Sequence, residues 1–520
     1  MATYRQPLVY LVGAGPGNPG LLTLRGRDCL AAADVVIYDK LVNLRLLEHA
    51  PAGARLICVN DLPGDHPERW PHVHRVMIEC ARAGQRVVRL KGGDPFIFGR
   101  GGEEAGALEQ ADVPYEIVPG VTSALGAGAF AAIPLTHRVH SSAVAFVTGH
   151  EYPEKPGSSV DWAALARFPG TLVIYMGISR LPQIVQTLLH HGMPADLPAA
   201  AVHRASTGDQ QTLEAPLAQL PAAVLNAGLV APAVVVIGTV VALRARLQWF
   251  EQRPLFNRRV LVTRPKHQAG DFVQRLEQLG ATPYILPTVE IRDPPSWDAV
   301  DRAIAHLASY QWLVFTSSNG VHAFVKRLRH LGRDLRALGT IRLAAIGPET
   351  AAALRGYHLE PDLVPEVYRA EALAAALKER VGGQRVLLAR ADRAREVLRA
   401  ELEAVADIEQ VCVYSQVDAV LEDAEPLNCL RRGEIDFVTL TSANIARSLI
   451  RELDETSRQR IRSGEVKLVT ISPVTSAAVV ELGLPVAAEA TVHTTAGVLA
   501  ALVDLATLCR EPEAAVNADP

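Results

Sequence analysis

The chain has 520 residues, which is too long for one ordinary hydrophobic core and indicates about two to four domains. Hydrophobic residues make up 49% of the sequence and charged residues 21%, which excludes a disordered chain and is typical of a well-packed globular protein. The formal net charge of −4 disfavours nucleic acid as a partner, so an anionic substrate has to be held by local groups of arginines.

The cysteines and the start of the chain indicate the compartment. The six cysteines, at positions 29, 58, 80, 412, 429 and 509, form no Cys-x-x-Cys pair, so neither a disulfide framework nor a zinc ribbon is predicted. The first residues lack the features of a signal peptide, and the most apolar stretch, 228–243, is interrupted by Pro232 and too short to cross a bilayer comfortably. We therefore expect a cytoplasmic protein without a membrane partner.

Short β-branched runs alternate with alanine- and leucine-rich helical segments along the whole chain. Examples are VVIYD at 35–39, TLVIYMG at 171–177, PAVVVIG at 232–238 and RVLVTR at 259–264. Apolar runs of this length, bounded by glycine and separated by helices, are typical of parallel sheets covered on both faces. We predict an α/β fold throughout.

A polar, proline-bearing segment, WFEQRPLFNRR at 249–259, separates two series of these elements. It predicts two modules in tandem, at 1–252 and 255–508. A second polar stretch, EYPEKPGSSVDW at 151–162, is expected to join two lobes within the first module. The last residues, 509–520, are expected to form a disordered tail.

The second module shows a faint internal repeat. RVLVTRP is echoed by RVLLARA, TSSNGV by TSANIA, and AIGPETAAAL by TISPVTSAAV. Each copy places a strand before a Ser, Thr, Asn or Gly turn that opens a helix, and helix N-termini favour anions. Two such lobes facing one cleft suit a ligand with many carboxylates. The alternative is a duplicated scaffold whose turns serve only as helix caps, and the residues alone leave both open.

The first module opens with a glycine-rich turn, VGAGPGNPG at 12–20. Gly13, Gly15 and Asp39 satisfy the loose spacing of a dinucleotide fingerprint, which leaves a nicotinamide-dependent dehydrogenase as one alternative. Pro19, however, removes a backbone N–H that a phosphate would use. Two more glycine-rich segments follow strands, at 89–105 and 118–138. Three loops without bulky side chains predict a backbone-lined pocket for a folded, nucleoside-like ligand.

These segments, together with VVIYDKLV and LVIYMG, resemble uroporphyrinogen-III C-methyltransferase, a tetrapyrrole methylase, over residues about 7–250. Residues about 255–505 are similar to uroporphyrinogen-III synthase through VLVTRP, VFTSSNGV, AAIGPETAAAL, YRAEALAAAL and VCVYSQ. The chain is thus identified as a fusion of the two families. The resemblance implies a methylase of two α/β lobes, divided near residues 150–160, followed by a bilobal α/β synthase.

For the first module, the resemblance implies two methyl transfers from S-adenosylmethionine to uroporphyrinogen III, at C2 and C7, giving precorrin-2 of the sirohaem and cobalamin branch. A methyl sulfonium requires in-line placement rather than a metal, so positioning supplies most of the rate and no metal is expected. The family's cofactor-contacting positions correspond to Pro16, Gly92, Gly93, Asp94, Ile97, Thr122, Ser123, Met176 and Ala205. Without the resemblance, Asp94 would be interpreted as a helix cap and Met176 as core.

Asp39 matches the base proposed for the family, because methylation leaves a proton to be lost from the macrocycle. Asp61 occupies the position of the family's proposed lysine donor, so that role is not carried over. Arg100, His137 and Arg138 lie beside glycine turns and are expected to pair with substrate carboxylates. Solvated surface is the alternative for these three.

For the second module, the resemblance implies cyclisation of hydroxymethylbilane with loss of water and inversion of the last pyrrole ring. Tyr414 matches the tyrosine proposed to assist departure of the hydroxyl, and a phenol suits that donation. The side chains expected to contact substrate carboxylates are Arg264, Ser317, Ser318, Ser442 and Thr475. A non-catalytic tetrapyrrole-binding module is the alternative for this half.

The expected partners are small-molecule tetrapyrroles. Relatives of the first module are homodimers, which implies a homodimer through the methyltransferase half. A metal chelatase is only weakly indicated by His72 and His74, since two histidines at alternate positions with no third ligand nearby make a poor metal site.

Overall fold

The architecture is taken from a computed structural model. It describes residue 6 and residues 8–65, 68–150, 160–393, 396–421 and 424–509. Most of the polar stretch at 151–162 and of the expected tail at 509–520 therefore lies outside the described residues. The chain divides into two units, the first made of Met1–Arg258 with Glu277–Thr282 and the second of Arg259–Leu276 with Pro283–Pro520.

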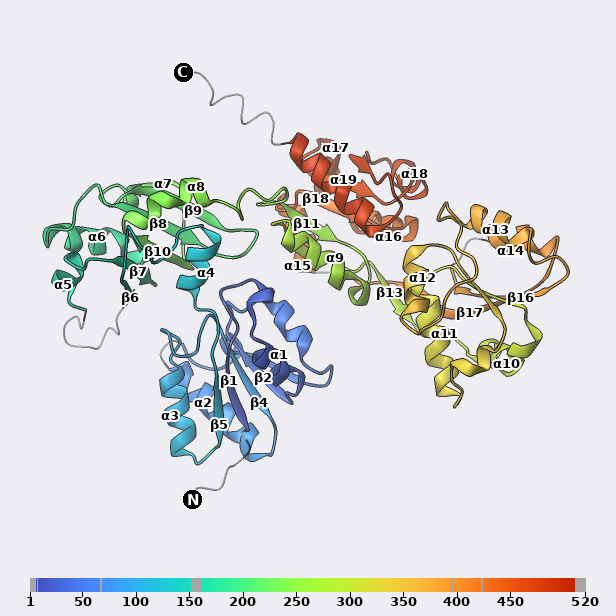
Figure 1. Ribbon diagram of the computed structural model, residues 1–520, viewed down its shortest axis with the longest axis horizontal. Helices are drawn as coiled ribbons and strands as arrows, with labels where there is room; N and C mark the ends of the chain where they lie inside the picture. The colour runs from blue at the N-terminus through green and yellow to red at the C-terminus, as the bar shows by residue number, and fades with distance from the viewer. Residues whose placement is uncertain are drawn as a thin grey trace. The chain divides into compact units, whose positions relative to one another are not determined.

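The first unit begins with a lobe built on a parallel five-stranded sheet, in the order β3-β2-β4-β1-β5 (Figure 1). Its strands are β1 (Val9–Gly13), β2 (Val35–Tyr38), β3 (Arg55–Cys58), β4 (Val87–Lys91) and β5 (Tyr115–Val118). One face packs on α2 (Arg69–Arg82) and α3 (Gly101–Gln110) through Met77 and Leu108. The other face packs on α1 (Leu24–Ala31), and this doubly covered sheet is the arrangement that the apolar runs predict.

The second lobe of this unit carries a mixed sheet, in the order β6-β7-β10-β8-β9. Its strands are β6 (Val144–Thr148), β7 (Thr171–Tyr175), β8 (Pro198–His203), β9 (Gln211–Pro216) and β10 (Ala233–Ile237). The prediction of parallel sheets is wrong here, because β10 runs antiparallel to both β7 and β8, and β8 and β9 form a hairpin. A fully buried apolar strand has the same composition whichever way its neighbours run, so its sequence does not reveal their direction.

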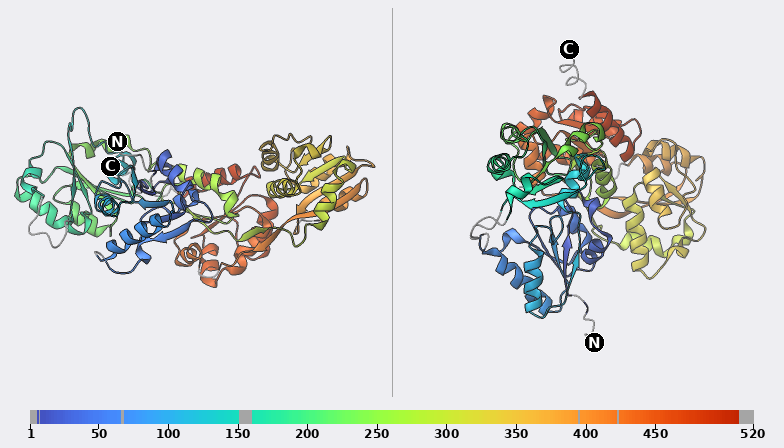
Figure 2. Two further views of the ribbon diagram at one scale, coloured as in Figure 1. Left: turned by 90° about the horizontal axis from the view of Figure 1, so that it is seen from below. Right: turned by 60° about the vertical axis from the view of Figure 1, so that its left-hand side comes forward.

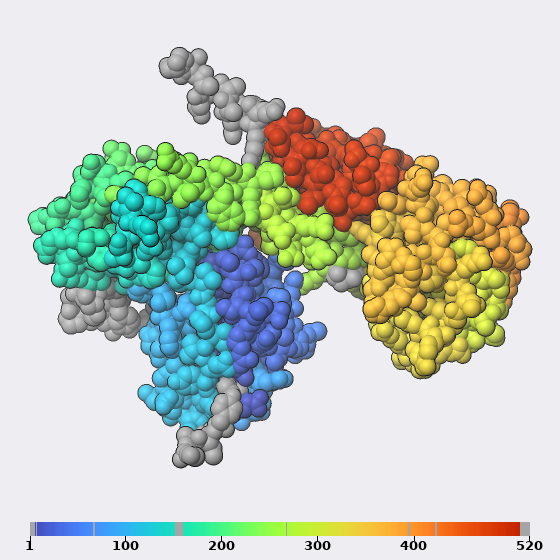
Figure 3. All heavy atoms as spheres, viewed as in Figure 1, coloured from blue at the N-terminus to red at the C-terminus, as the bar shows by residue number. Residues whose placement is uncertain are grey.

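Helix α4 (Ser123–Phe130) follows β5 but packs on the second sheet, where Ala124 and Ala127 contact Val173 and Val236. It thereby connects the lobes, and Figure 3 shows the first lobe (blue) meeting the cyan and green second lobe. The helices α5 (Trp162–Ala166), α6 (Leu181–His190), α7 (Leu220–Asn226) and α8 (Arg244–Leu247) complete the unit. Of these, α6 and α7 cover the opposite face of the sheet from α4.

The second unit contains two five-stranded sheets, in the orders β12-β11-β18-β19-β20 and β13-β17-β16-β14-β15. The first lobe combines both ends of the segment: β11 (Arg259–Val262), β12 (Thr282–Ile285), β18 (Phe437–Leu440), β19 (Lys467–Thr470) and β20 (Ala488–Glu489). The second lobe is formed by the segment between them: β13 (Val289–Arg292), β14 (Trp312–Phe315), β15 (Arg342–Ala345), β16 (Arg385–Ala391) and β17 (Asp407–Asp418).

Helices surround both sheets of the second unit. Those of the first lobe are α9 (Lys266–Gln278), α15 (Glu425–Arg432), α16 (Ala443–Glu452), α17 (Glu455–Arg462), α18 (Pro473–Glu481) and α19 (Thr495–Leu508). Those of the second lobe are α10 (Asp298–Ala305), α11 (Ser318–His330), α12 (Pro348–Arg355), α13 (Ala370–Lys378) and α14 (Val397–Glu403). The chain crosses between the lobes twice, beside the antiparallel pair of β13 and β17, and this narrow connection is visible in Figure 2.

Candidate active sites

Three glycine-rich turns meet at the carboxyl edge of the first parallel sheet. A Cβ atom on Gly120 would lie 2.3 Å from the carbonyl oxygen of Gly93, and one on Gly13 would lie 2.6 Å from Cα of Gly120. Gly93 N–H also donates to the carbonyl of Gly15 at 2.8 Å, and Gly15 N–H returns a bond to Gly93 at 3.2 Å. Backbone therefore packs on backbone, and only glycine permits this close approach.

Asp94 connects two of these turns. One carboxylate oxygen accepts a hydrogen bond from Gly120 N–H at 2.9 Å and the other from Phe96 N–H at 2.8 Å. Each oxygen keeps a further lone pair. The neighbouring Gly92 is exposed, and its Cβ position has no atom within 4 Å, so this side of the turn is open.

The second lobe contributes Tyr175 to the same region. Its hydroxyl lies 2.7 Å from the Thr122 hydroxyl and accepts a hydrogen bond from Ala124 N–H at 3.2 Å, at the start of α4. Burial raises the pKa of Tyr175, so the phenol keeps its proton at neutral pH. The Phe98 ring lies 4.8 Å from the Tyr175 ring, centroid to centroid. Sequence reasoning missed both residues, although each stands beside an expected site residue, Ile97 or Met176.

The loop between β8 and β9, residues 204–210, closes on the first glycine turn. Asn18 N–H donates to Oγ of Ser206 at 3.2 Å, and a Cβ atom on Gly17 would meet the Thr207 side chain at 2.8 Å. Ser206 has φ +71° and Arg204 has φ +44°. Residues other than glycine disfavour this left-handed backbone conformation, so the surrounding contacts must stabilise it.

The structure brings most of the expected cofactor residues together. Its contacts join the turns that carry Pro16, Gly93, Asp94, Thr122 and Ala205. Ser123 lies beside Gly93, since a Cβ there would be 3.6 Å from Ser123 N. Ile97 and Met176 have large exposed apolar surfaces, and Met176 adopts φ +53° directly after Tyr175.

A buried cluster of charges lies beneath Asp39. Arg89 and Glu104 have no exposed surface and Lys91 is 1% exposed, although Arg89 and Lys91 belong to the interior strand β4. Arg89 Nε donates to Glu104 Oε1 at 2.9 Å, and Lys91 Nζ lies 2.8 Å from Glu104 Oε2. Arg89 also pairs with Asp39, whose carboxylate accepts a further bond from Gly92 N–H at 3.3 Å. Two cations and two carboxylates therefore balance one another.

The electrostatics of the cluster follow from this pairing. Burial disfavours the charged form of Arg89, but Asp39 and Glu104 outweigh that cost and raise the pKa of the guanidinium. Burial, together with the neighbouring Arg89, lowers the pKa of Lys91. Asp39 is the partly exposed end of the cluster, with 28% of its side chain accessible, and is held at the carboxyl edge of β2.

The expected substrate residues of the first unit make local contacts. Arg100 stacks on the Trp70 ring at 4.7 Å and pairs with Glu103 at 3.3 Å. His137 bridges to Ser141 through the backbone, and Arg138 is exposed beside it. Asp61 ends the 3₁₀ turn after β3 and is also exposed.

In the second unit, Tyr414 on β17 is 4% exposed, and its hydroxyl lies 3.0 Å from Oγ of Ser317. Burial raises the pKa of this phenol, so it remains a proton donor. Ser317 caps α11 by accepting from Gly320 N–H at 3.1 Å, and Ser318 is the first residue of that helix.

The repeated turn in the other lobe has the same construction. Ser442 caps α16 by accepting from Ile445 N–H at 3.2 Å. The asparagines that follow the two caps make further contacts that the sequence did not reveal: Gln268 donates to Asn319 at 2.7 Å, and Asn444 donates to Gln416 at 3.0 Å. Each of these bonds joins one lobe of the unit to the other.

Arg264 and Thr475 are the remaining expected contacts of this unit. The Arg264 guanidinium lies 3.7 Å from the Glu349 carboxylate, and burial lowers the pKa of Arg264. Thr475 is 1% exposed, and its hydroxyl lies 3.2 Å from that of Ser472, so its described contact is within the turn.

Two observations bear on metals and membranes. Within the described ranges, no group of three or more His, Cys, Asp or Glu side chains is arranged to hold a metal ion. None of the helices described by the structure is long and apolar enough to cross a membrane.

Fold and sites together define a chain of two α/β units. In the first, glycine turns leave backbone exposed at the ends of strands, and in the second each lobe carries a serine-capped helix N-terminus of the same construction. Residues 8–221 match the family model of tetrapyrrole (corrin/porphyrin) methylases, and residues 270–500 match that of uroporphyrinogen-III synthase HemD. The chain therefore belongs to the family that fuses a tetrapyrrole methyltransferase with a uroporphyrinogen-III synthase, which confirms the resemblance and the α/β class.

Individual relatives agree with this assignment. The porphyrin biosynthesis protein HemD of Ruminiclostridium josui is 35% identical over 453 residues, covering 86% of this chain and 89% of that protein. The uroporphyrinogen-III C-methyltransferase of Bacillus subtilis is 36% identical over 360 residues, covering 68% of this chain and 74% of that protein. The siroheme synthase of Zymomonas mobilis is 48% identical over 249 residues, 48% of this chain and 52% of the relative, so this chain spans about half of its length.

Among solved structures, uroporphyrin III C-methyl transferase from Thermus thermophilus is 42% identical. The match has a TM-score of 0.38 and covers 45% of this chain and 92% of that one.

Proposed function

We propose that the chain carries out two consecutive steps of tetrapyrrole synthesis. Residues 255–508 cyclise hydroxymethylbilane to uroporphyrinogen III, with loss of water and inversion of ring D. Residues 1–252 then methylate uroporphyrinogen III at C2 and C7 with two molecules of S-adenosylmethionine, giving precorrin-2 for sirohaem and cobalamin. Membership of the fused family supports the order and the pairing of these activities.

The convergence of the glycine turns carries the methyltransferase proposal. S-adenosylmethionine supplies a methyl group on a sulfonium, which requires placement rather than activation. Gly92 leaves one side of its turn open to the ligand, and Gly93 holds the same turn against Gly15. Asp94 has lone pairs left to accept ribose hydroxyls. Ile97 and Met176 offer the exposed apolar surface that the rest of such a ligand needs. We assign Pro16, Thr122, Ser123 and Ala205 to the same site.

We assign Asp39 as the base that removes the proton left on the macrocycle after methyl transfer. Its carboxylate is fixed by Arg89 and by the backbone of Gly92, so its position is set before substrate binds. It also lies next to the proposed methyl-donor site, because Gly92 belongs to both. Arg100, His137 and Arg138 remain the proposed partners of substrate carboxylates in this unit.

The methyltransferase proposal is tested by ligand binding to the full chain. S-adenosylhomocysteine should raise the melting temperature of the transition that belongs to the first unit, with a shift that grows with ligand concentration, whereas NAD should not. Stabilisation by NAD but not by S-adenosylhomocysteine would favour the dehydrogenase interpretation of the glycine turn instead.

We assign Tyr414 as the donor that assists loss of the hydroxyl from hydroxymethylbilane. It remains protonated and is oriented by Ser317. Arg264, Ser318, Ser442 and Thr475 belong to the proposed substrate-binding set, with Thr475 acting through the turn it stabilises. Without an enzyme, the linear tetrapyrrole closes to an isomer other than type III. The ratio of the two isomers formed from hydroxymethylbilane therefore tests whether this unit is catalytic. Type III product supports catalysis, and an unchanged yield of the spontaneous isomer would support a non-catalytic binding module.

We further propose that the protein acts in the cytoplasm and forms a homodimer through its methyltransferase half. Light scattering of the purified chain measures the second point. A mass of twice 55.9 kDa is expected, and a monomer over the working concentration range would contradict it.

A further inference from the structure

A short segment of the synthase match belongs to the first unit. Residues Glu277–Thr282, which we call the strap, lie inside the 270–500 match but group with Met1–Arg258. They pair with the residues that end the methyltransferase half: Leu255 N–H donates to Leu279 at 3.0 Å, and Thr282 N–H donates to Arg258 at 2.9 Å.

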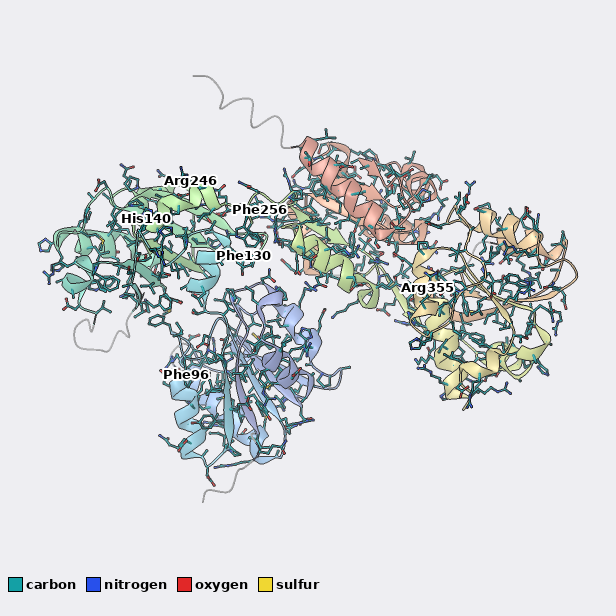
Figure 4. All side chains as sticks on the ribbon, in the orientation of Figure 1. Phe96, Phe130, His140, Arg246, Phe256 and Arg355 are labelled. Carbon is teal, nitrogen blue, oxygen red and sulfur yellow. The ribbon has the colours of Figure 1, made fainter. Side chains whose placement is uncertain are left out.

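The segment that contains the residues paired with the strap is joined to the end of α4 by a series of aromatic contacts. The rings of Phe130 and Phe250 lie 4.8 Å apart, and those of Phe250 and Phe256 lie 5.5 Å apart, centroid to centroid. Figure 4 labels Phe130, at the end of α4, and Phe256, in the segment that follows α8. The strap thus rests on a base that is continuous with the first unit.

The strap contacts the β8–β9 loop of the second lobe. Oγ1 of Thr282 donates to Asp209 Oδ1 at 3.1 Å, and Asp209 pairs with Arg204 at 3.3 Å. A Cβ atom on Gly208 would lie 2.6 Å from the backbone of Ala281. Loop and strap therefore touch backbone to backbone, and glycine is needed for that contact.

The strap also contacts the first lobe. Glu277 forms an ion pair with Arg45 in the 3₁₀ helix Leu44–His49, and 20% and 23% of the two side chains are exposed. Asn43, which caps this helix, donates to the carbonyl of Gly17 at 2.9 Å. One short segment therefore bridges the two lobes beside the place where the glycine turn meets the β8–β9 loop.

We propose that the strap is a positioning element of the methyl-donor site. By tying Arg45 and Asp209 together, it holds the β8–β9 loop, with Ala205, against the glycine turn before the ligand arrives. A loop that is already ordered in the unliganded protein loses little conformational entropy when the ligand binds. The strap therefore strengthens affinity for the donor. The inference rests on the proposed S-adenosylmethionine site.

Charge reversal in the full-length chain tests the inference. Arg45→Glu and Glu277→Arg should each weaken S-adenosylhomocysteine binding, measured by calorimetry, by about three- to tenfold, since a partly buried ion pair becomes a repulsion. The double variant restores the pair in reverse and should bind within about twofold of the parent chain. Asp28→Arg, at an exposed pair with Arg27, is the matched control and should leave the affinity unchanged.

A second variant acts on the other contact. Gly208→Ala should weaken binding similarly, because its Cβ pushes the loop away from the strap. The rate of hydroxymethylbilane cyclisation should stay unchanged in all these variants, although Glu277 lies within the synthase match. Unchanged affinity in the single variants, no recovery in the double variant, or loss of cyclisation instead would overturn the role of the strap. Absence of binding to the parent chain would overturn the proposed function together with it.

Discussion

Replacing Glu104 by glutamine should destabilise the first unit far more than its position on a helix would imply. The substitution keeps the shape of the side chain but removes the charge that faces both Arg89 and Lys91, at 2.9 and 2.8 Å. Asp39 alone then balances two cations that are almost without exposed surface. Breaking a buried pair in this way costs about 3–5 kcal/mol, which multiplies the unfolded fraction by at least about 100.

The adjacent residue provides the control. Glu103 is 55% exposed and pairs with Arg100 at 3.3 Å, so Glu103→Gln should change the stability by less than about 1 kcal/mol. Both changes remove one carboxylate from the same turn of α3. Comparing them therefore separates burial of the charge from net charge and from the propensity of the helix.

The assay must resolve the two units, because a two-unit chain does not unfold in a single transition. The buried thiols Cys29 and Cys80 in the first lobe and Cys429 in the second unit are suitable probes. Pulsed alkylation in increasing urea, read by peptide mass spectrometry, should show Cys29 and Cys80 exposed at lower urea in Glu104→Gln, with Cys429 unchanged. Equal midpoints for the two glutamine variants would refute the buried-charge account.

The loss should also depend on pH. Since the pKa of Lys91 is lowered in the folded state, the unfolded chain binds more protons between that value and 10.5, and stability rises with pH across this window. Loss of Glu104 removes an interaction that favours protonated Lys91 and so lowers the pKa of Lys91 further in the folded state. The rise of stability with pH is then larger in the variant than in the parent chain. The destabilisation by Glu104→Gln should therefore be smaller at pH 9 than at pH 6.

Three further predictions concern the two proposed catalytic residues, Asp39 and Tyr414, and the buried thiol of Cys429. Asp39→Asn should lower methylation at least about 100-fold without changing cyclisation, whereas Asp28→Asn should change neither, as measured by methyl incorporation and isomer analysis. Tyr414→Phe should lower type III formation about 100-fold, while Tyr357→Phe, outside the proposed site, should not. Burial raises the pKa of Cys429 to about 11, so alkylation of the folded chain should spare it at pH 8, and its contribution to stability should disappear as pH rises from 9 to 11. Joint loss of both activities in one variant, or prompt alkylation of Cys429, would contradict these assignments.

The sequence was a good guide to what lies within one strand and the turn after it. VVIYD and the glycine segments predicted parts of the first sheet and the loops at its edge, because glycine spacing directly reflects close backbone approach. Partners far along the chain were harder to see. Nothing in the string VVRLK indicates that Arg89 and Lys91 are buried, since their compensating Glu104 lies on the following helix.

The misses share a physical cause. The direction of β10 depends on which strands become its neighbours, and the role of Tyr175 depends on the start of α4, 51 residues away. The strap was hidden for the same reason, because Glu277 and Thr282 contact Arg45 and Asp209, which lie far earlier in the sequence of the same unit. Local patterns carry propensity, whereas these features arise from tertiary contacts.

One incubation tests the central claim that two ordered enzymatic steps share this chain. Purified protein is given hydroxymethylbilane and methyl-labelled S-adenosylmethionine, and the macrocycle is analysed for isomer and label. A type III ring bearing two labelled methyl groups is the expected product. A ring of the spontaneous isomer without label would contradict the claim.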